Sequence, residues 1–229
     1  MLNNRPWRGN LEWIRVISHW LKPEIRQSSG YPILLLGGVA LLVSTAIGIA
    51  NLGTHADIAQ RQLEDLQATL QQVIPAKYYD NDPVRDTVTV QEGDRSVRVY
   101  RARRKGQVQA VSFRTTAPGY GSTEMVMIIG VDRDGKLLGV RVISHAETPG
   151  LGDKIETSKS DWVSSFNGRS LGDPPPAGWA VKKDGGVFDQ FTGATITPRA
   201  VVKAVKGGLE FFANHRAVLL DESSGGNDR

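Results

Sequence analysis

The sequence predicts an α+β protein: a transmembrane helix, a stalk helix, and a domain with an antiparallel sheet and flanking helices. Three observations predict this architecture. A long apolar stretch without charge lies in the first quarter of the sequence, and alternating segments separated by turn sequences fill the middle. A segment with helical spacing follows a Thr-Pro pair near the end.

The transmembrane helix is predicted over 31–52, because no Asp, Glu, Lys or Arg occurs from Gln27 to Ala56. A helix of this length can cross a hydrocarbon core of roughly 30 Å. A buried helix of a soluble protein is one alternative. A cleavable signal peptide is another, since Gly48-Ile49-Ala50 has small residues at a cleavage-like spacing, but the segment before the apolar stretch is long for a signal peptide.

The basic residues around this span are distributed unequally. Five precede it, and Arg61 is the one Lys or Arg in residues 53–72. This bias predicts a cytoplasmic N-terminus and a C-terminal domain outside, which is the periplasm for a bacterial inner membrane. We expect residues 1–30, which contain three tryptophans, to form an amphipathic cytoplasmic segment at the membrane lipid surface, with a disordered tail as the alternative.

Composition excludes several kinds of chemistry. The sequence has no cysteine, which removes thiolate metal ligands, iron–sulfur clusters, thiol nucleophiles and disulfides. Most of the net charge of +4 lies in residues 1–30, so the rest of the sequence lacks the basic surface that nucleic-acid binding requires. Redox chemistry in this protein would therefore depend on a bound cofactor.

Beyond the membrane span, the periodicity changes from helix to strand. Leu63, Leu66, Leu70 and Val73 recur at helical spacing and predict a stalk helix over 53–75. Alternation then predicts five strands, with turns at Lys105-Gly106 and at 132–135. The predicted strands are 87–91, 97–103, 108–113, 124–131 and 137–144. After them we expect a short helical stretch at 162–166 and a helix from 198 to about 214. We place the folded domain at 76–215 and a flexible tail at 216–229.

Two segments could bind a ligand. In the first, 189–198, Pro198 suits the first helical position and Thr197 the N-cap. Thr195 then lies where free backbone N–H groups favour a phosphate, although a well-capped helix alone would explain the pattern. The second, 145–152, follows a strand and has glycines that let a planar ligand approach, or it is a connecting loop.

These segments together resemble the FMN-binding domain found in the G subunit of Rnf electron-transport complexes and in the C subunit of the sodium-pumping NADH:quinone reductase. The similarity runs from about Ala117 to Phe212. It includes the motifs PGYG, IIGVDRDGKLLGVRVISH, HAETPGLGDKI and DQFTGATITPRAVVKAV. In that family the last threonine of the S/T-G-A-T motif carries FMN through a phosphoester bond, and here it is Thr195.

The resemblance implies that a flavin transferase attaches FMN with FAD as donor. Thr192 and Thr197 are the alternative attachment points. The contacts expected to hold the flavin are Glu147, Thr148, Gly150, Leu151, Gly152, Thr192, Gly193, Ala194 and Thr197, with His145 and Lys154 as further candidates. The protein would position and tune this cofactor, so we expect neither a catalytic residue nor a metal in the chain itself.

The expected function is electron relay within a membrane-bound, ion-translocating complex that passes electrons between ferredoxin and NAD. Its partners would be the other subunits of that complex. The C subunit of the quinone reductase is the nearest alternative. A membrane-tethered periplasmic binding or assembly module without a cofactor is the alternative from another class.

Overall fold

The computed structural model describes residues 30–222, and the contacts within the protein divide it into two units, 1–60 and 61–229. The segment expected to lie at the membrane surface, 1–30, falls outside the described residues except for Gly30. The last residues of the expected tail, 223–229, also fall outside them.

Helix α3 spans Tyr31–Val73, so the expected transmembrane and stalk segments form one continuous helix. Within the first unit, Tyr31–Ile49 is long and apolar enough to cross a membrane, with a mean hydropathy of 2.2. None of this stretch is buried inside the protein, unlike the core helix of a soluble domain. Its exposed leucines and isoleucines need an apolar surrounding, which fits a single-pass membrane anchor.

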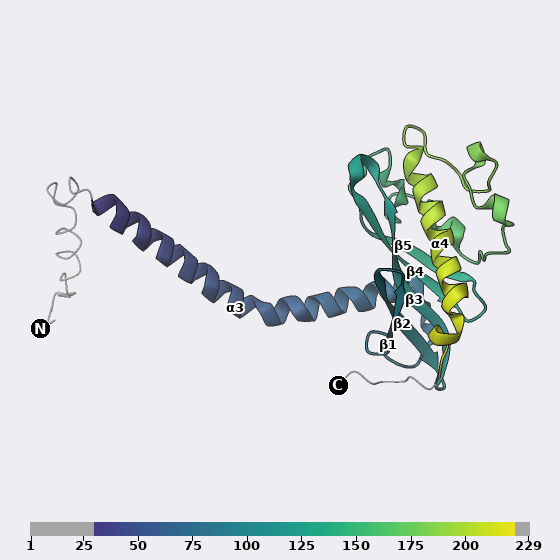
Figure 1. Cartoon of the computed structure of the whole chain (residues 1–229), viewed down its shortest axis with the longest axis horizontal. Helices are drawn as coiled ribbons and strands as arrows, with labels where there is room; N and C mark the ends of the chain where they lie inside the picture. The colour runs from purple at the N-terminus through teal and green to yellow at the C-terminus, as the bar shows by residue number, and fades with distance from the viewer. Residues whose placement is uncertain (1–29, 223–229) are drawn as a thin grey trace, which may run out of the picture. The chain divides into compact units, whose positions relative to one another are not determined.

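The second unit is built on a five-stranded antiparallel sheet in which each strand pairs with its neighbour in sequence (Figure 1). The strands are β1 (Thr87–Glu92), β2 (Arg95–Arg104), β3 (Gln107–Pro118), β4 (Glu124–Asp132) and β5 (Leu137–Ser144). The expected strands and the antiparallel sheet are confirmed. Strand β3 is longer than expected because 114–118 continue to pair with β4 beyond the last residue paired with β2.

Both expected hairpin turns are present. Gly106 has a positive φ angle of 81°, which glycine adopts without cost, and Lys105 before it has a φ angle of 53°, which is uncommon for a residue with a side chain. In the other turn, the Asp132 carboxylate accepts hydrogen bonds from the backbone N–H groups of Asp134 and Lys136. Such local bonding fixes a tight turn.

Helix α4 (Ile196–Leu219) lies across one face of the sheet. Its buried residues, among them Val201, Val205 and Leu209, pack against apolar side chains of β2 to β5 in the larger hydrophobic core. The helix extends about five residues beyond the expected end. Leu219 is fully buried there, so the first part of the expected flexible tail belongs to the folded domain.

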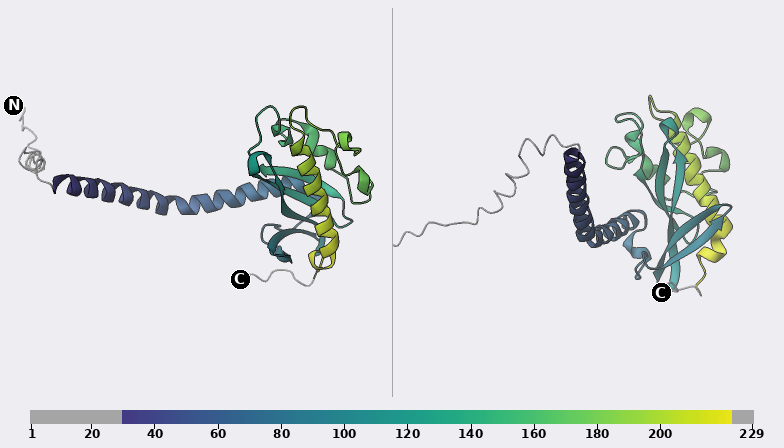
Figure 2. Two further views of the ribbon diagram at one scale, coloured as in Figure 1. Left: turned by 45° about the horizontal axis from the view of Figure 1, so that its top comes forward. Right: turned by 60° about the vertical axis from the view of Figure 1, so that its left-hand side comes forward.

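The end of α3 packs against the opposite face of the sheet, as the rotated views show (Figure 2). Leu70, Val73 and Ile74 are buried there in a smaller core with residues of β2 to β4. Gly130 and Gly139 permit this contact, because a Cβ atom on Gly130 would lie 2.2 Å from the Val73 carbonyl oxygen. The domain is therefore a helix–sheet–helix arrangement.

Short 3₁₀ helices and loops connect β5 to α4, including η4 (Asp161–Phe166) at the expected short helical stretch. An aromatic cluster holds this region together. The Trp162 ring lies 4.9 Å from the Phe191 ring between centroids, and its indole N–H donates a 2.8 Å hydrogen bond to the Asp189 carbonyl oxygen. These contacts fix the chain immediately before the threonine-rich segment.

Candidate functional site

The segment 191–195 forms a tight turn that leads into α4. Phe191 is buried in the aromatic cluster, and it forms an isolated β-bridge with Ala194. Gly193 at the tip has a φ angle of 84°, a conformation that residues with a side chain rarely adopt. Thr192 and Gly193 are exposed, whereas Ala194 and Thr195 are half-buried. The buried Phe191 therefore anchors the turn, and Gly193 lies at its exposed tip.

Helix α4 begins at Ile196 with Thr195 as the N-cap, so the expectation that Thr197 caps the helix is wrong. The hydroxyl of Thr195 makes no capping hydrogen bond. The first turn of α4 also contains no acidic residue. Free N–H groups at a helix start attract anions, so this end of α4 offers an anion site beside a hydroxyl without a capping bond.

Thr197 lies inside the protein rather than at the helix cap. Only 2% of it is exposed, and its hydroxyl donates a 2.5 Å hydrogen bond to Oε2 of Glu147. The other carboxylate oxygen of Glu147 accepts a 2.9 Å bond from the backbone N–H of Tyr120. Glu147 thus joins the loop after β5, the loop before β4 and the first turn of α4.

The loop 147–152 turns sharply before it reaches η3 (Asp153–Ile155). The backbone N–H groups of Leu151 and Gly152 both donate to the Thr148 carbonyl oxygen, and Gly150 has a φ angle of 79°. Leu151 is 41% exposed, and its Cδ2 would lie 3.0 Å from a Cβ on Gly193. The side chain of Leu151 therefore lies beside the glycine tip of the 191–195 turn.

Asp153 supports this loop from within the protein. The backbone N–H of Gly150, followed by the Lys159 side chain, lowers the pKa of the Asp153 carboxyl from its ordinary value. The ammonium of Lys159 lies 2.9 Å from the carboxylate. Asp153 therefore carries its negative charge at neutral pH and ties the loop to the segment that follows.

His145 supports the beginning of the same loop. Its Nδ1 accepts a 3.1 Å hydrogen bond from the backbone N–H of Glu147, and its Nε2 lies 3.1 Å from the Glu156 carboxylate. Because Nδ1 is the acceptor, the neutral ring carries its proton on Nε2 and donates it to Glu156. The imidazole therefore acts here as a bridge between two parts of the loop.

The structure brings most of the expected site residues together at the start of α4. Glu147 contacts Thr197, Leu151 lies beside Gly193, and Gly152 lies against Glu147. Sequence reasoning missed the part played by the loop at Gly119 and Tyr120, which meets Glu147 from a distant position in the chain. The exposure of the remaining candidates differs: Thr148, Gly150 and Leu151 are exposed, Gly152 is buried, and Lys154 is half-buried.

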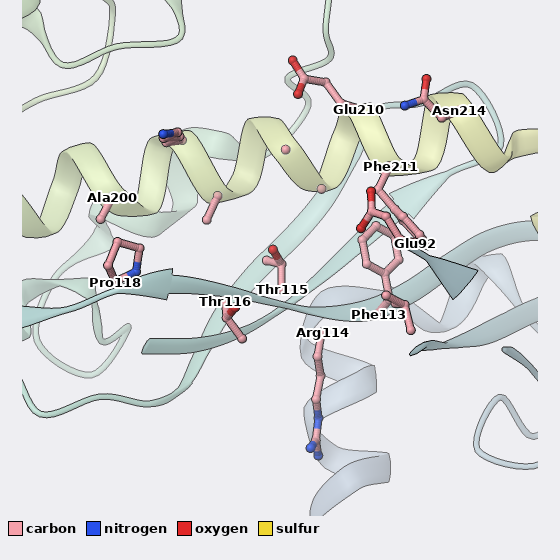
Figure 3. A pocket seen from close by; sticks show the side chains of 15 residues that line it. Glu92, Phe113, Arg114, Thr115, Thr116, Pro118, Ala200, Glu210, Phe211 and Asn214 are labelled. Atoms are coloured by element: carbon pink, nitrogen blue, oxygen red, sulfur yellow. The ribbon is translucent and has the colours of Figure 1, made fainter. Parts of the chain in front are cut away.

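A separate groove of about 440 Å³ lies between α4 and β3 (Figure 3). It forms where β3 extends beyond β2 and faces small residues of α4, including Ala204 and Gly207. Phe113 and Phe211 close one end, with ring centroids 4.9 Å apart, while Arg114 points away from the helix. Neither Thr195 nor the loop 147–152 lines this groove, so it is distinct from the site at the start of α4.

Comparison with known proteins gives the class of the domain. Residues 119–210 match the family described as the FMN-binding domain, and this range contains the two loops and the start of α4. Similar proteins match over most of the chain. A protein of Cereibacter sphaeroides (strain ATCC 17029 / ATH 2.4.9) is 54% identical over 188 residues, which are 82% of this chain and 85% of that protein.

Two further relatives extend this similarity to other organisms. One from Stutzerimonas stutzeri is 49% identical over 87% of each chain, and one from Shewanella piezotolerans (strain WP3 / JCM 13877) is 45% identical over 82% of this chain and 91% of its own. All three are named as the G subunit of an ion-translocating oxidoreductase complex. The chain belongs to this G-subunit family, as the resemblance of its motifs indicated.

Proposed function

We propose that this chain relays electrons through an FMN that is esterified to Thr195, within an Rnf-type ion-translocating oxidoreductase complex. The names of the relatives support membership of such a complex, and the FMN-binding domain supports the cofactor. When bound, FMN supplies the redox chemistry, and the protein has no cysteine that could supply a thiol–disulfide couple instead. The residues of the chain hold, orient and shield it.

The observation that carries this proposal is the position of the Thr195 hydroxyl. Thr195 is half-buried at the start of a long helix, makes no capping hydrogen bond and follows a glycine tip with little steric bulk. The Thr197 hydroxyl is buried and donates to Glu147, so it is unavailable for attachment without rearrangement. Thr192 is exposed but lies within the turn beside Gly193, four residues before α4 begins at Ile196.

The surroundings of Thr195 fit FMN. The N–H groups in the first turn of α4 can donate to the phosphate, a contribution of about 0.3–1 kcal/mol. Leu151 offers an exposed apolar side chain beside Gly193, and the exposed backbone at Thr148 and Gly150 lets a planar ring approach. A helix terminus alone cannot retain a cofactor outside the cell, so the covalent bond provides the retention.

Attachment requires a flavin transferase with FAD as donor. The Thr195 hydroxyl oxygen forms a bond to the phosphorus of the FMN half, the pyrophosphate bond of FAD breaks, and AMP leaves. The hydroxyl proton passes to a base on the transferase. The exposed Thr192 and Gly193 make the acceptor turn accessible to such a partner.

We expect Thr195→Val to fold but to lose the flavin completely. Valine has nearly the shape of threonine but no hydroxyl to esterify. The full chain would be produced with a flavin transferase, and the covalent flavin would be detected by fluorescence in denaturing gels and by intact mass. Thr192→Val is the matched control and should retain the flavin. Flavin on the Thr195→Val chain, at the same mass increase as the parent, would overturn the assignment.

We further propose that the chain is a single-pass protein of the bacterial inner membrane with the flavin domain in the periplasm. The excess of basic residues before the span supports this orientation. A protease added to spheroplasts should digest the domain from outside while a cytoplasmic control protein stays intact. Full protection of the domain under these conditions would contradict the orientation.

The same flavin assay distinguishes the proposed function from the alternative that belongs to another class of protein. A periplasmic binding or assembly module would carry no fluorescence through denaturation, whichever threonine is changed. The alternative within the class, the C subunit of the sodium-translocating quinone reductase, differs in its partner proteins. The three relatives described above are each named as the G subunit, which favours the proposal made here.

A further inference from the structure

Glu147 is a buried carboxylate that no cation neutralises among the ion pairs of residues 30–222. Only 7% of the residue is exposed. Its two oxygens accept hydrogen bonds from one backbone N–H, at Tyr120, and one hydroxyl, at Thr197. Burying an ionised carboxylate is costly unless its oxygens are hydrogen-bonded, so these contacts determine the arrangement around it.

Two glycines let the surrounding loops close on this carboxylate. A Cβ atom on Gly152 would lie 2.4 Å from Oε2 of Glu147, and one on Gly119 would lie 2.9 Å from Oε1. Real Cβ atoms essentially never approach another atom as closely as this. Gly119 precedes Glu147 in the sequence and Gly152 follows it. Two separate loops are therefore shaped to fit the same side chain.

Both carboxylate oxygens of Glu147 accept hydrogen bonds inside the protein. Exposed residues, rather than Glu147, form the surface around Thr195. Leu151 and the backbone of 148–150 lie on one side of this surface, and the 191–195 turn lies on the other. The side chain of Glu147 lies beneath them and links both to the loop at Tyr120. Glu147 is therefore placed to support the site rather than to line it.

We propose that Glu147 is a positioning residue that holds the loop of Leu151 and the turn of Thr195 next to one another at the site before and after the cofactor is attached. This inference deepens the proposed function and rests on it for the role of Thr195. It assigns Glu147 no contact with the flavin ring. Its effect reaches the cofactor through Thr197 in the first turn of α4 and through the sharp turn at 148–152.

The helix start makes a carboxylate suitable for this task. The first turn of α4 contains no acidic residue of its own, and Glu147 supplies a negative charge there through its bond to Thr197. The positive end of a helix stabilises such a charge. Glutamine at this position keeps the shape and one acceptor oxygen for the Tyr120 N–H but removes the charge.

The first test uses the full chain in detergent without flavin, so that it does not depend on where FMN is attached. Amide hydrogen exchange would be compared for the parent, Glu147→Ala, Glu147→Gln and the exposed-residue control Glu210→Ala. In Glu147→Ala, we expect exchange of the Tyr120, Leu151 and Gly152 amides to accelerate about tenfold or more, because a buried hydrogen-bonding centre is lost. Glu147→Gln should recover most of this protection, and Glu210→Ala should leave it unchanged.

The second test uses the same chains loaded by a flavin transferase. Glu147→Ala should keep the mass of one covalent FMN, while the flavin fluorescence becomes less polarised and its reduction potential shifts, because Leu151 no longer holds the ring. Glu147→Gln should restore the polarisation. A residue that serves only global stability would change thermal unfolding without this change in the attached flavin.

A double-mutant cycle tests the fit of Gly152 to Glu147. Gly152→Ala should accelerate exchange of the loop amides. In the double variant with Glu147→Ala, the acceleration should be much smaller than the two single effects combined, because the two changes disturb the same contact. Unchanged exchange and polarisation in Glu147→Ala would overturn the positioning role, as would additive effects in the cycle. Loss of flavin from the parent chain would instead refute the proposed function and leave the exchange result standing.

Discussion

The two ends of α4 each lie near a carboxylate that joins distant segments, half-buried at Asp86 and buried at Glu147, but the two carboxylates are satisfied differently. Beyond the C-terminal end, Asp86 pairs with Arg101 at 2.6 Å and with Arg103 at 2.5 Å, and both guanidinium groups also donate to the Asp221 carbonyl oxygen. At the N-terminal end, Glu147 accepts from a backbone N–H and a hydroxyl.

This difference distinguishes a cluster that stabilises the fold from a candidate ligand site. Around Asp86, two positive charges meet one carboxylate in ion pairs, and the same two guanidinium groups hold the segment after α4 by hydrogen bonds to the Asp221 carbonyl oxygen. Around Glu147, the charge is held by neutral donors and a helix start, next to a hydroxyl and an exposed apolar side chain. A carboxylate therefore serves stability at one end of α4 and the arrangement of a ligand site at the other.

The largest expected effect on stability comes from Asp86→Ala. It removes the carboxylate that pairs with Arg101, which is only 1% exposed, and removing one partner of such an ion pair costs about 3–5 kcal/mol. Denaturant unfolding of the full chain in detergent would measure the change in free energy of unfolding. Asp94→Ala, in the exposed turn between β1 and β2, is the control. A loss below about 1 kcal/mol would show that the cluster is dispensable, contrary to the comparison.

An intermediate effect is expected from Thr197→Val at the other end of α4. The change leaves Oε2 of Glu147 without its hydroxyl donor, and an unsatisfied buried acceptor costs about 1–3 kcal/mol. Thr195→Val, two residues earlier, should change the free energy of unfolding by less than about 0.5 kcal/mol because its hydroxyl makes no capping bond. Equal losses in the two variants, measured by the same denaturant assay without flavin, would contradict the distinction between these threonines.

The smallest effect concerns Asp153 and depends on pH. The lowered pKa of this carboxyl in the folded state means that its stabilisation is present above its ordinary pKa and is lost as the pH falls through the lowered value. Asp153→Asn should therefore unfold at a lower temperature than the parent at neutral pH, with a difference that shrinks in acid. Thermal unfolding measured across this range checks the trend, and Lys159→Met should reproduce part of it. A difference that grows toward low pH would reverse the inferred sign.

The sequence predicts the sheet well because its determinants are local. Alternating residues and turn sequences such as Lys105-Gly106 specify each hairpin without reference to distant parts of the chain. The extension of β3 to Pro118 was not predictable in this way, because residues 114–118 belong to the strand through pairing with β4. A cross-strand partner, rather than alternation, determines that boundary.

The site was predictable only in part for a similar reason. The motif around Thr195 identified the expected acceptor segment, but local capping preferences placed Thr197 at the helix cap, whereas it bonds to Glu147. That bond and the one from Tyr120 join residues 50 and 27 positions apart in the chain. No local pattern reports such contacts, so the buried position of Glu147 emerges only from the fold.

The packing of α3 against the sheet has a practical consequence for preparing the domain without its membrane helix. A fragment that began at residue 76, where the sequence suggested the domain boundary, would lack Leu70, Val73 and Ile74 and would expose the apolar face that they cover, including Ile128. Exposed apolar surface of this kind favours aggregation. A soluble fragment should instead begin near Arg61, where the second unit starts, so that the last turns of α3 remain as part of its core.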